Sequence, residues 1–113
     1  MGQTLSRRDV IGGAAASAAV LITTPLRAAA PVVHDVAIKS FAYEPAVVRV
    51  HVGDMIRWTN HDVAPHTASA DEFGWDTGEI VKGGTGKITV TEDMKKSYFC
   101  AFHPHMRGSI EIL

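Results

Sequence analysis

The sequence predicts an all-β fold, a sandwich of about seven short strands. Three observations predict it. Short runs with apolar residues at alternate positions recur after residue 31, residues typical of turns separate these runs, and no segment there repeats its apolar residues with a helical period. The length of 113 residues suits one small domain.

The first expected strand covers residues 32–38, and the next, residues 47–52, alternates valines with polar residues. Between them, residues 41–45 are expected to form a turn, because Pro45 lacks the N–H group that a strand ladder needs. A Gly-Asp turn then leads into a third strand, over residues 55–60, which is centred on a tryptophan.

The second half of the domain is less regular. A polar loop over residues 60–65 leads to His66, and a short strand is expected over residues 67–70. Residues 71–86 include five glycines and are expected to be mostly turn. The remaining strands are expected over residues 87–91, 97–102 and 108–113.

Residues 1–30 have the layout of a bacterial Tat-type signal peptide. Arg7 and Arg8 precede an uncharged stretch rich in Ala and Gly, and small residues follow at 28–30, where cleavage is expected. An uncleaved membrane anchor is the alternative, but the apolar stretch is shorter than the ~20 residues of a membrane-spanning helix. We therefore expect export to the periplasm, no stable membrane insertion after processing, and a mature domain over residues 31–113.

Charge and cysteine content narrow the functional classes. Eleven Lys and Arg against twelve Asp and Glu give a net charge of −1, and the chain has no basic stripe of the kind that binds nucleic acid. Cys100 is the only cysteine, so an exported chain of this sequence has no internal disulfide. The lone thiol is then a metal ligand, a reactive group or a residue without a function. The histidine and methionine that follow it in the sequence favour a metal ligand.

Three soft donors follow one another at a spacing of three residues: Cys100, His103 and Met106. A thiolate, an imidazole and a thioether favour copper over hard cations, and a weak thioether indicates a blue-copper centre more than a zinc site. The same spacing would also suit one face of a helix. However, residues 98–102 are aromatic and strand-like, and Pro104 disfavours a helical conformation at the residue before it. We therefore expect a strand that ends at Cys100 and a loop that carries the other two donors.

A trigonal copper site with two histidines needs a second imidazole from elsewhere in the chain. His66 is the best placed, because it follows a Pro-containing loop that can reach the cysteine strand. Four others compete less well: His34 and His51 are expected on strands, His61 is expected to be exposed, and His105 has a poorer spacing from the cysteine.

The run from Cys100 to Ile110 resembles the ligand loop of the cupredoxins, and its two-residue gaps resemble the amicyanins, whose loop is the shortest. Another group is similar to the first-ligand region of the same family: Val52-Gly53-Asp54, Trp58, Asn60 and Ala64-Pro65-His66. The residues Phe41, Tyr43 and Pro45 and the run Asp76-Thr77-Gly78 also fit the family. Two positions depart from the family pattern. Thr67 replaces a frequent Asn that connects the two ligand loops, and His105 replaces an apolar residue.

The resemblance implies a Greek-key β-sandwich with one type 1 copper ion. It implies His66, Cys100 and His103 as the equatorial ligands and Met106 as the axial ligand, with the backbone N–H of Thr67 as a donor to the cysteine sulfur. The implied function is periplasmic electron transfer by a monomer between two redox proteins, such as a dehydrogenase and a cytochrome c.

A copper-binding carrier or chaperone without a redox role is the alternative function. Such a protein usually offers extra exposed Met and His ligands, and here only Met55, Met94 and His105 are spare. An enzyme is not expected, because a multicopper oxidase or a copper nitrite reductase needs further copper sites and several domains.

Overall fold

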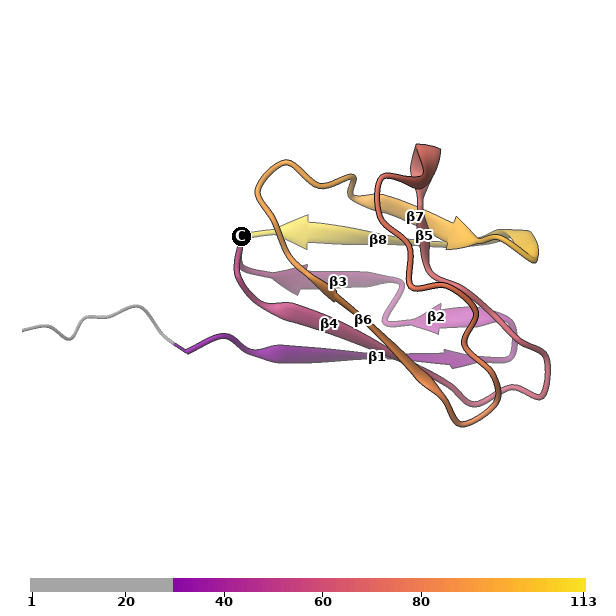
Figure 1. Ribbon diagram of the computed structural model, residues 1–113. Helices are drawn as coiled ribbons and strands as arrows, with labels where there is room; N and C mark the ends of the chain where they lie inside the picture. The colour runs from indigo at the N-terminus through magenta and orange to yellow at the C-terminus, as the bar shows by residue number, and fades with distance from the viewer. Residues whose placement is uncertain (1–29) are drawn as a thin grey trace, which may run out of the picture. The chain divides into compact units, whose positions relative to one another are not determined.

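Two four-stranded β-sheets form the two layers of the computed structural model, which describes residues 30–113 (Figure 1). One sheet has the strand order β2-β1-β4-β6 and the other β3-β8-β7-β5. The elements are β1 (Val33–Lys39), β2 (Ala42–Glu44), β3 (Val47–Val50), β4 (Met55–Asn60), β5 (Ser69–Ala70), the short 3₁₀ helix η2 (Asp71–Phe73), β6 (Thr85–Thr89), β7 (Ser97–Cys100) and β8 (His103–Ile112). Pro31–Leu113 form one compact unit. The predicted signal peptide lies, apart from its last residue, outside the described residues.

The predicted all-β sandwich is confirmed, with eight strands in the described residues instead of about seven. The additional strand is β2, in a stretch that we expected to be a turn. The turn is shorter than predicted: Ser40 and Phe41 alone connect β1 to β2, and Ile38 pairs with Tyr43 across the hairpin. Both turn residues have positive φ, 54° and 58°, as a two-residue type I′ hairpin requires. Because Asn-Gly usually occupies such turns, Ser-Phe carries no recognisable sequence signal.

The prediction of a loop between Cys100 and residue 108 is also wrong. β7 ends at Cys100 as expected, but β8 already begins at His103, so that only two residues form the turn. The pairing between the strands changes from Phe99↔Arg107 to Cys100↔His103, which leaves residues 104–106 without partners on β7. Pro104 has no N–H for such a ladder, and a bulge of this kind redirects the side chains that follow it.

The core lies between the two sheets and follows the period-two pattern of the strands. In β4, buried residues alternate with partly exposed ones, so that Ile56 and Trp58 are fully buried. Trp58 stacks on Trp75 with ring centroids 5.6 Å apart and donates a hydrogen bond from Nε1 to the Tyr98 hydroxyl at 3.3 Å. Burial raises the pKa of Tyr98 to about 12, so that this hydroxyl stays protonated at neutral pH.

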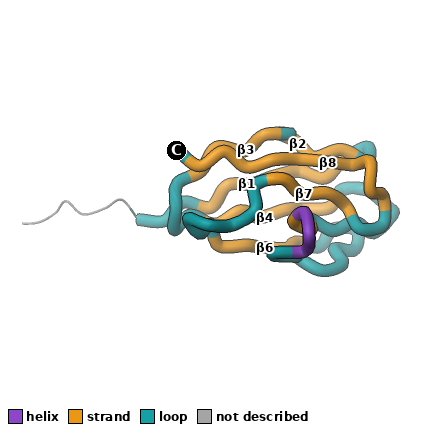
Figure 2. Tube along the Cα trace, turned by 90° about the horizontal axis from the view of Figure 1, so that it is seen from above, coloured by secondary structure: helices purple, strands orange, loops and turns teal. Residues whose placement is uncertain are grey.

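The strands of both sheets run along one long axis of the domain, and loops gather at its two ends (Figure 2). The turn between β7 and β8 lies at one end, and the C-terminus lies at the other (Figure 1). Residues 30–113 contain no helix with the length and apolar character needed to cross a membrane.

Candidate metal centre

His66, Cys100 and His103 converge at the end of the sandwich where β7 turns into β8. Their donor atoms all lie within 4.8 Å of one another. The Cys100 sulfur is 3.6 Å from Nδ1 of His66 and 3.6 Å from Nδ1 of His103. His66 and Cys100 are fully buried, whereas His103 is partly exposed. The structure therefore brings together three of the four predicted donors, with one imidazole edge near the surface.

Local structure explains how these three side chains meet. The two-residue turn places His103 directly opposite Cys100 on the neighbouring strand. His66 lies between β4 and β5, where its backbone N–H and C=O form an antiparallel bridge with Ile80, with N–O distances of 3.1 and 2.7 Å. Because backbone pairing fixes both segments, the donor atoms are positioned by the fold itself.

Met106 is the fourth predicted donor. It lies on β8, in the stretch without partners on β7, and its side chain is only 3% exposed. Its role as the weak axial donor of a copper site stays a prediction.

The Cys100 sulfur accepts a hydrogen bond from the backbone N–H of Thr67, with a distance of 3.3 Å. This confirms the expected donor. The Tyr43 hydroxyl in turn donates to the Thr67 carbonyl. Burial, together with the nearby Cys100, raises the pKa of Tyr43 well above its ordinary value, so that it remains a neutral donor. The Cys100 sulfur therefore has a backbone N–H dipole beside it, held in turn by the Tyr43 hydroxyl, and hydrogen bonds of this kind tune a metal site.

Thr67 also connects the two ligand segments through its side chain. Its hydroxyl oxygen accepts a hydrogen bond from the N–H of Ala101 at 2.8 Å and contacts the Ser69 hydroxyl at 2.9 Å. Ala101 directly follows Cys100. The single hydroxyl of Thr67 therefore supplies the connection between the loops that the family pattern assigns to Asn at this position.

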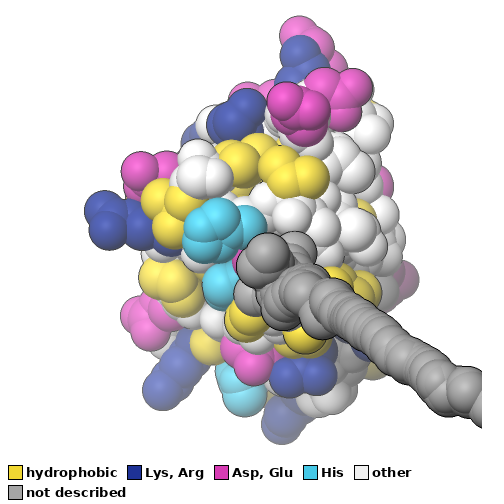
Figure 3. Space-filling model, turned by 90° about the vertical axis from the view of Figure 1, so that its left-hand side faces the viewer, with side chains coloured by type: hydrophobic (Ala, Val, Ile, Leu, Met, Phe, Trp, Pro, Cys, Tyr) yellow, Lys and Arg dark blue, Asp and Glu magenta, His cyan; other side chains and the backbone are white. Residues whose placement is uncertain are grey.

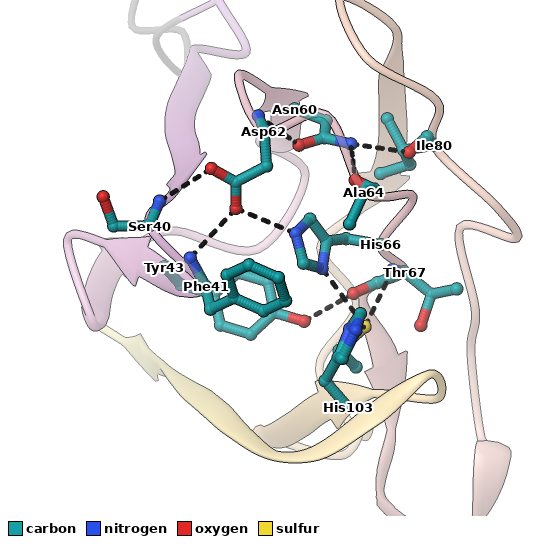
Figure 4. A network of polar contacts seen from close by, with 11 residues as sticks. Ser40, Phe41, Tyr43, Asn60, Asp62, Ala64, His66, Thr67, Ile80 and His103 are labelled. Atoms are coloured by element: carbon teal, nitrogen blue, oxygen red, sulfur yellow. Dashed lines mark hydrogen bonds and ion pairs between the residues drawn. The ribbon is translucent and has the colours of Figure 1, made fainter.

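The outer nitrogen of His66 faces a carboxylate that the sequence analysis missed. Nε2 lies 2.9 Å from Oδ2 of Asp62; Oδ1 of the same carboxylate accepts the N–H group of Ser40, and Oδ2 accepts that of Phe41 (Figure 4). A carboxylate beside Nε2 favours the tautomer with the proton on that nitrogen, which leaves Nδ1 free to bind a metal. The available sequence signal was an acidic residue four positions before the histidine.

The environment of Asp62 favours its ionised form. Burial raises the pKa of this carboxyl, but hydrogen bonds from Phe41, Ser40 and His66 outweigh burial, so that the pKa lies below its usual value. The acceptor role of Asp62 is therefore available at neutral pH.

The other histidines lie outside this cluster. His34 contacts Asp54 with a distance of 2.8 Å between Nε2 and Oδ2, and His51, His61 and His105 are exposed. His51, which we expected on a strand, follows the end of β3.

Histidine side chains also lie on the face shown in Figure 3, which is the left-hand end of the domain in Figure 1. The β7–β8 turn, however, lies at the right-hand end. Within residues 30–113, no second group of three or more His, Cys, Asp and Glu donors converges in this way.

Comparisons with known proteins find similar sequences and similar folds. The amicyanin of Paracoccus versutus is 33% identical over 80 residues, which cover 66% of this chain and 61% of the relative. The chain thus matches less than two thirds of the length of that curated relative. A solved amicyanin variant in its Cu(I) form superposes with a TM-score of 0.61 and 30% identity, over 78% of this chain and 87% of that chain. A copper-containing nitrite reductase from Thermus scotoductus, 23% identical, shares the fold, with a TM-score of 0.66 over 81% of this chain and 25% of that chain.

The family comparison covers nearly the whole sequence. The family described as Cupredoxin-like domain matches residues 13–112, a range that includes all eight strands and all four predicted donors. The chain belongs to the cupredoxin-like family.

Proposed function

We propose that this chain is a blue copper protein that carries one electron at a time between redox partners. His66, Cys100 and His103 would be its equatorial ligands and Met106 its axial ligand. The observation that supports the proposal most directly is the convergence of two imidazole nitrogens and one thiol sulfur within 4.8 Å. The amicyanin relatives support the same function by family membership.

The donor set fits copper better than other common metals. Two imidazoles and one thiolate in a plane with a weak thioether are typical of blue copper, whereas structural zinc sites are closed by four strong ligands. When bound, copper supplies the one-electron redox chemistry. Everything else in the proposal concerns the protein residues around it.

The protein contributes a fixed arrangement of ligands. Copper in its two oxidation states prefers different geometries, so a site that does not move lowers the reorganisation that accompanies each transfer. Here backbone pairing fixes Cys100 opposite His103, and the hydroxyl of Thr67 connects Ala101 to the His66 segment. The N–H group of Thr67 stabilises negative charge on the sulfur.

The partly exposed His103 is the proposed route for electrons to and from partners. Its neighbour Phe102 is 51% exposed, and Phe41, which contacts the His103 ring, is 47% exposed. Apolar surface around an exposed ligand edge suits brief contact with another protein. We propose redox proteins, such as a periplasmic dehydrogenase and a cytochrome c, as the donor and acceptor.

Localisation and processing are further parts of the proposal. A Tat-type signal over residues 1–30, cleaved near 28–30, would deliver a monomeric mature domain, residues 31–113, to the periplasm. The proposal includes no enzymatic turnover.

Copper titration of the purified protein tests this function. We expect one Cu(II) per chain, an intense blue thiolate-to-copper absorption and the narrow copper hyperfine splitting of type 1 sites in the EPR spectrum. Cys100→Ser and His66→Ala should abolish the blue absorption, whereas His51→Ala, which changes an exposed histidine outside the cluster, should preserve it. Copper uptake without colour in the wild type would refute the electron-transfer proposal and favour the carrier.

A further inference from the structure

One carboxylate connects the buried His66 to a hairpin more than twenty residues earlier in the chain. Oδ1 of Asp62 accepts the N–H of Ser40 at 2.8 Å, and Oδ2 accepts the N–H of Phe41 at 2.9 Å. The same Oδ2 lies 2.9 Å from Nε2 of His66 (Figure 4). The Asp62 side chain is only 14% exposed, so water competes little for these contacts.

The hairpin that Asp62 contacts has an unusual backbone. Ser40 and Phe41 have φ values of 54° and 58°, in the left-handed region that residues with a Cβ seldom adopt. This backbone points two consecutive N–H groups at one carboxylate. Removal of the carboxylate would leave the left-handed turn without these two hydrogen bonds.

The same turn places the Phe41 ring against both candidate ligand histidines. The ring lies edge-on to His66, with centroids 5.0 Å apart at 89°, and edge-on to His103, with centroids 4.8 Å apart at 86°. Phe41 is 47% exposed as a residue, so it lies at the surface while its ring packs against the two imidazoles.

We propose that Asp62 is a positioning residue with two linked effects on the metal centre. It keeps the proton of His66 on Nε2, so that Nδ1 is unprotonated and would be free to bind a metal, and it fixes the β1–β2 turn that places Phe41 against the histidine pair. The inference rests on the proposed function, because positioning for a metal has meaning only if these histidines are ligands.

The first experiment uses the metal-free full-length protein, so that its outcome does not depend on copper. Nitrogen-15 NMR of the histidine rings reports the tautomer, and amide hydrogen exchange reports the turn. In the wild type we expect His66 with a slowly exchanging proton on Nε2 and ring-current shifts from Phe41 on the ring protons of His103. In Asp62→Ala we expect mixed tautomers, loss of those ring-current shifts, and exchange of the Ser40 and Phe41 amides that is at least about tenfold faster.

Three comparison variants separate the two effects from general loss of stability. Phe41→Leu should remove the ring-current shifts but keep the His66 tautomer, because its backbone N–H remains. Asp35→Ala removes an exposed carboxylate, paired with Arg57 at 2.7 Å, and should change neither readout. Asp62→Asn retains one acceptor oxygen, so it should protect the His66 proton while the Ser40 amide exchanges faster. If Asp62→Ala does not fold, Asp62→Asn is the variant that tests the role of the carboxylate.

Copper affinity is the second readout. Loss of a hydrogen-bonding partner of a ligand histidine typically weakens metal affinity about 10- to 100-fold, so we expect a loss of this size for Asp62→Ala and less than about twofold for Asp35→Ala. An Asp62→Ala variant that retains the Nε2 proton, the ring-current shifts and the wild-type affinity would overturn the inference, and so would an Asp62→Asn variant whose Ser40 amide exchanges no faster than in the wild type. If the wild type itself does not become blue, the proposed function is overturned. The NMR experiment on the metal-free protein then still decides whether Asp62 positions His66 and Phe41.

Discussion

Replacing Thr67 by valine removes one hydroxyl from the connection between the two ligand segments while nearly preserving side-chain shape. The N–H of Ala101, which donates to this hydroxyl at 2.8 Å, would be left without its partner. Ser69 would lose a contact of 2.9 Å but keep its hydrogen bond to Asp76 at 3.0 Å. Thr67 is only 4% exposed, but Ala101 is exposed and the hydrogen bond is part-buried, so water can replace some of the lost contact. An ordinary hydrogen bond contributes roughly 0.5–1.5 kcal/mol net, so we expect a loss of about 1 kcal/mol in the free energy of unfolding.

The measurement is chemical denaturation of the metal-free protein, which removes any contribution from copper binding. Thr67→Ser, which keeps the hydroxyl, is the matched control and should recover most of the loss. The exchange rate of the Ala101 amide should rise in Thr67→Val and not in Thr67→Ser. If Thr67→Val stays within about 0.5 kcal/mol of the wild type and the Ala101 amide remains protected, the hydroxyl does not connect the two segments as argued.

Three further predictions concern separate parts of the domain. Hydrogen bonds from His51 and His34 lower the pKa of Asp54 to about 2, below the ordinary value of about 3.9. The ionised form therefore stabilises the fold above about pH 4, and this stability should fall as the pH drops toward 2. Acid unfolding should show that loss in the wild type but not in Asp54→Asn. A Cβ at Gly108 would lie 2.4 Å from Cζ of the buried Tyr98 ring, so Gly108→Ala should lower the free energy of unfolding by roughly 1–3 kcal/mol. Thermal unfolding measures this loss, and an unchanged midpoint temperature would contradict this packing. Met106→Leu should keep the blue colour but raise the reduction potential measured by voltammetry, because the thioether no longer donates to Cu(II); an unchanged potential would exclude Met106 as the axial ligand.

Sequence patterns predicted those parts of the fold that depend on local chemistry. The strand over residues 55–60 was predicted with the observed bounds, because its alternating side chains match its alternating burial. The β1–β2 turn was predicted too long, over residues 41–45, because the N–H groups of its two residues are hydrogen-bonded to Asp62, which is distant in sequence. Local propensity cannot report a turn whose backbone is stabilised by a side chain from another loop.

The candidate site shows the same division. Soft donors at regular spacing were sufficient to predict the positions of Cys100 and His103, and the structure brings them together with His66. The strand-like course of the chain after His103 was not predicted, because Pro104 disfavours regular pairing and only the wider sheet shows that β8 continues through a stretch without partners on β7. Asp62 was also missed, since one acidic residue in a polar loop is usually solvated.

The connections around His66 explain why the arrangement of the site should be insensitive to the charge of a bound metal. His66 and its neighbour Thr67 together make hydrogen bonds to the β1–β2 hairpin, through Asp62 and Tyr43, and to the end of β7, through Cys100. A shift of His66 would therefore strain contacts in two other segments. These connections are made by protein groups alone, so that they exist before a metal binds and do not depend on its oxidation state. A site built in this way resists rearrangement when an electron arrives or leaves, which is the physical requirement for a fast electron carrier and is unnecessary in a protein that only stores or delivers copper.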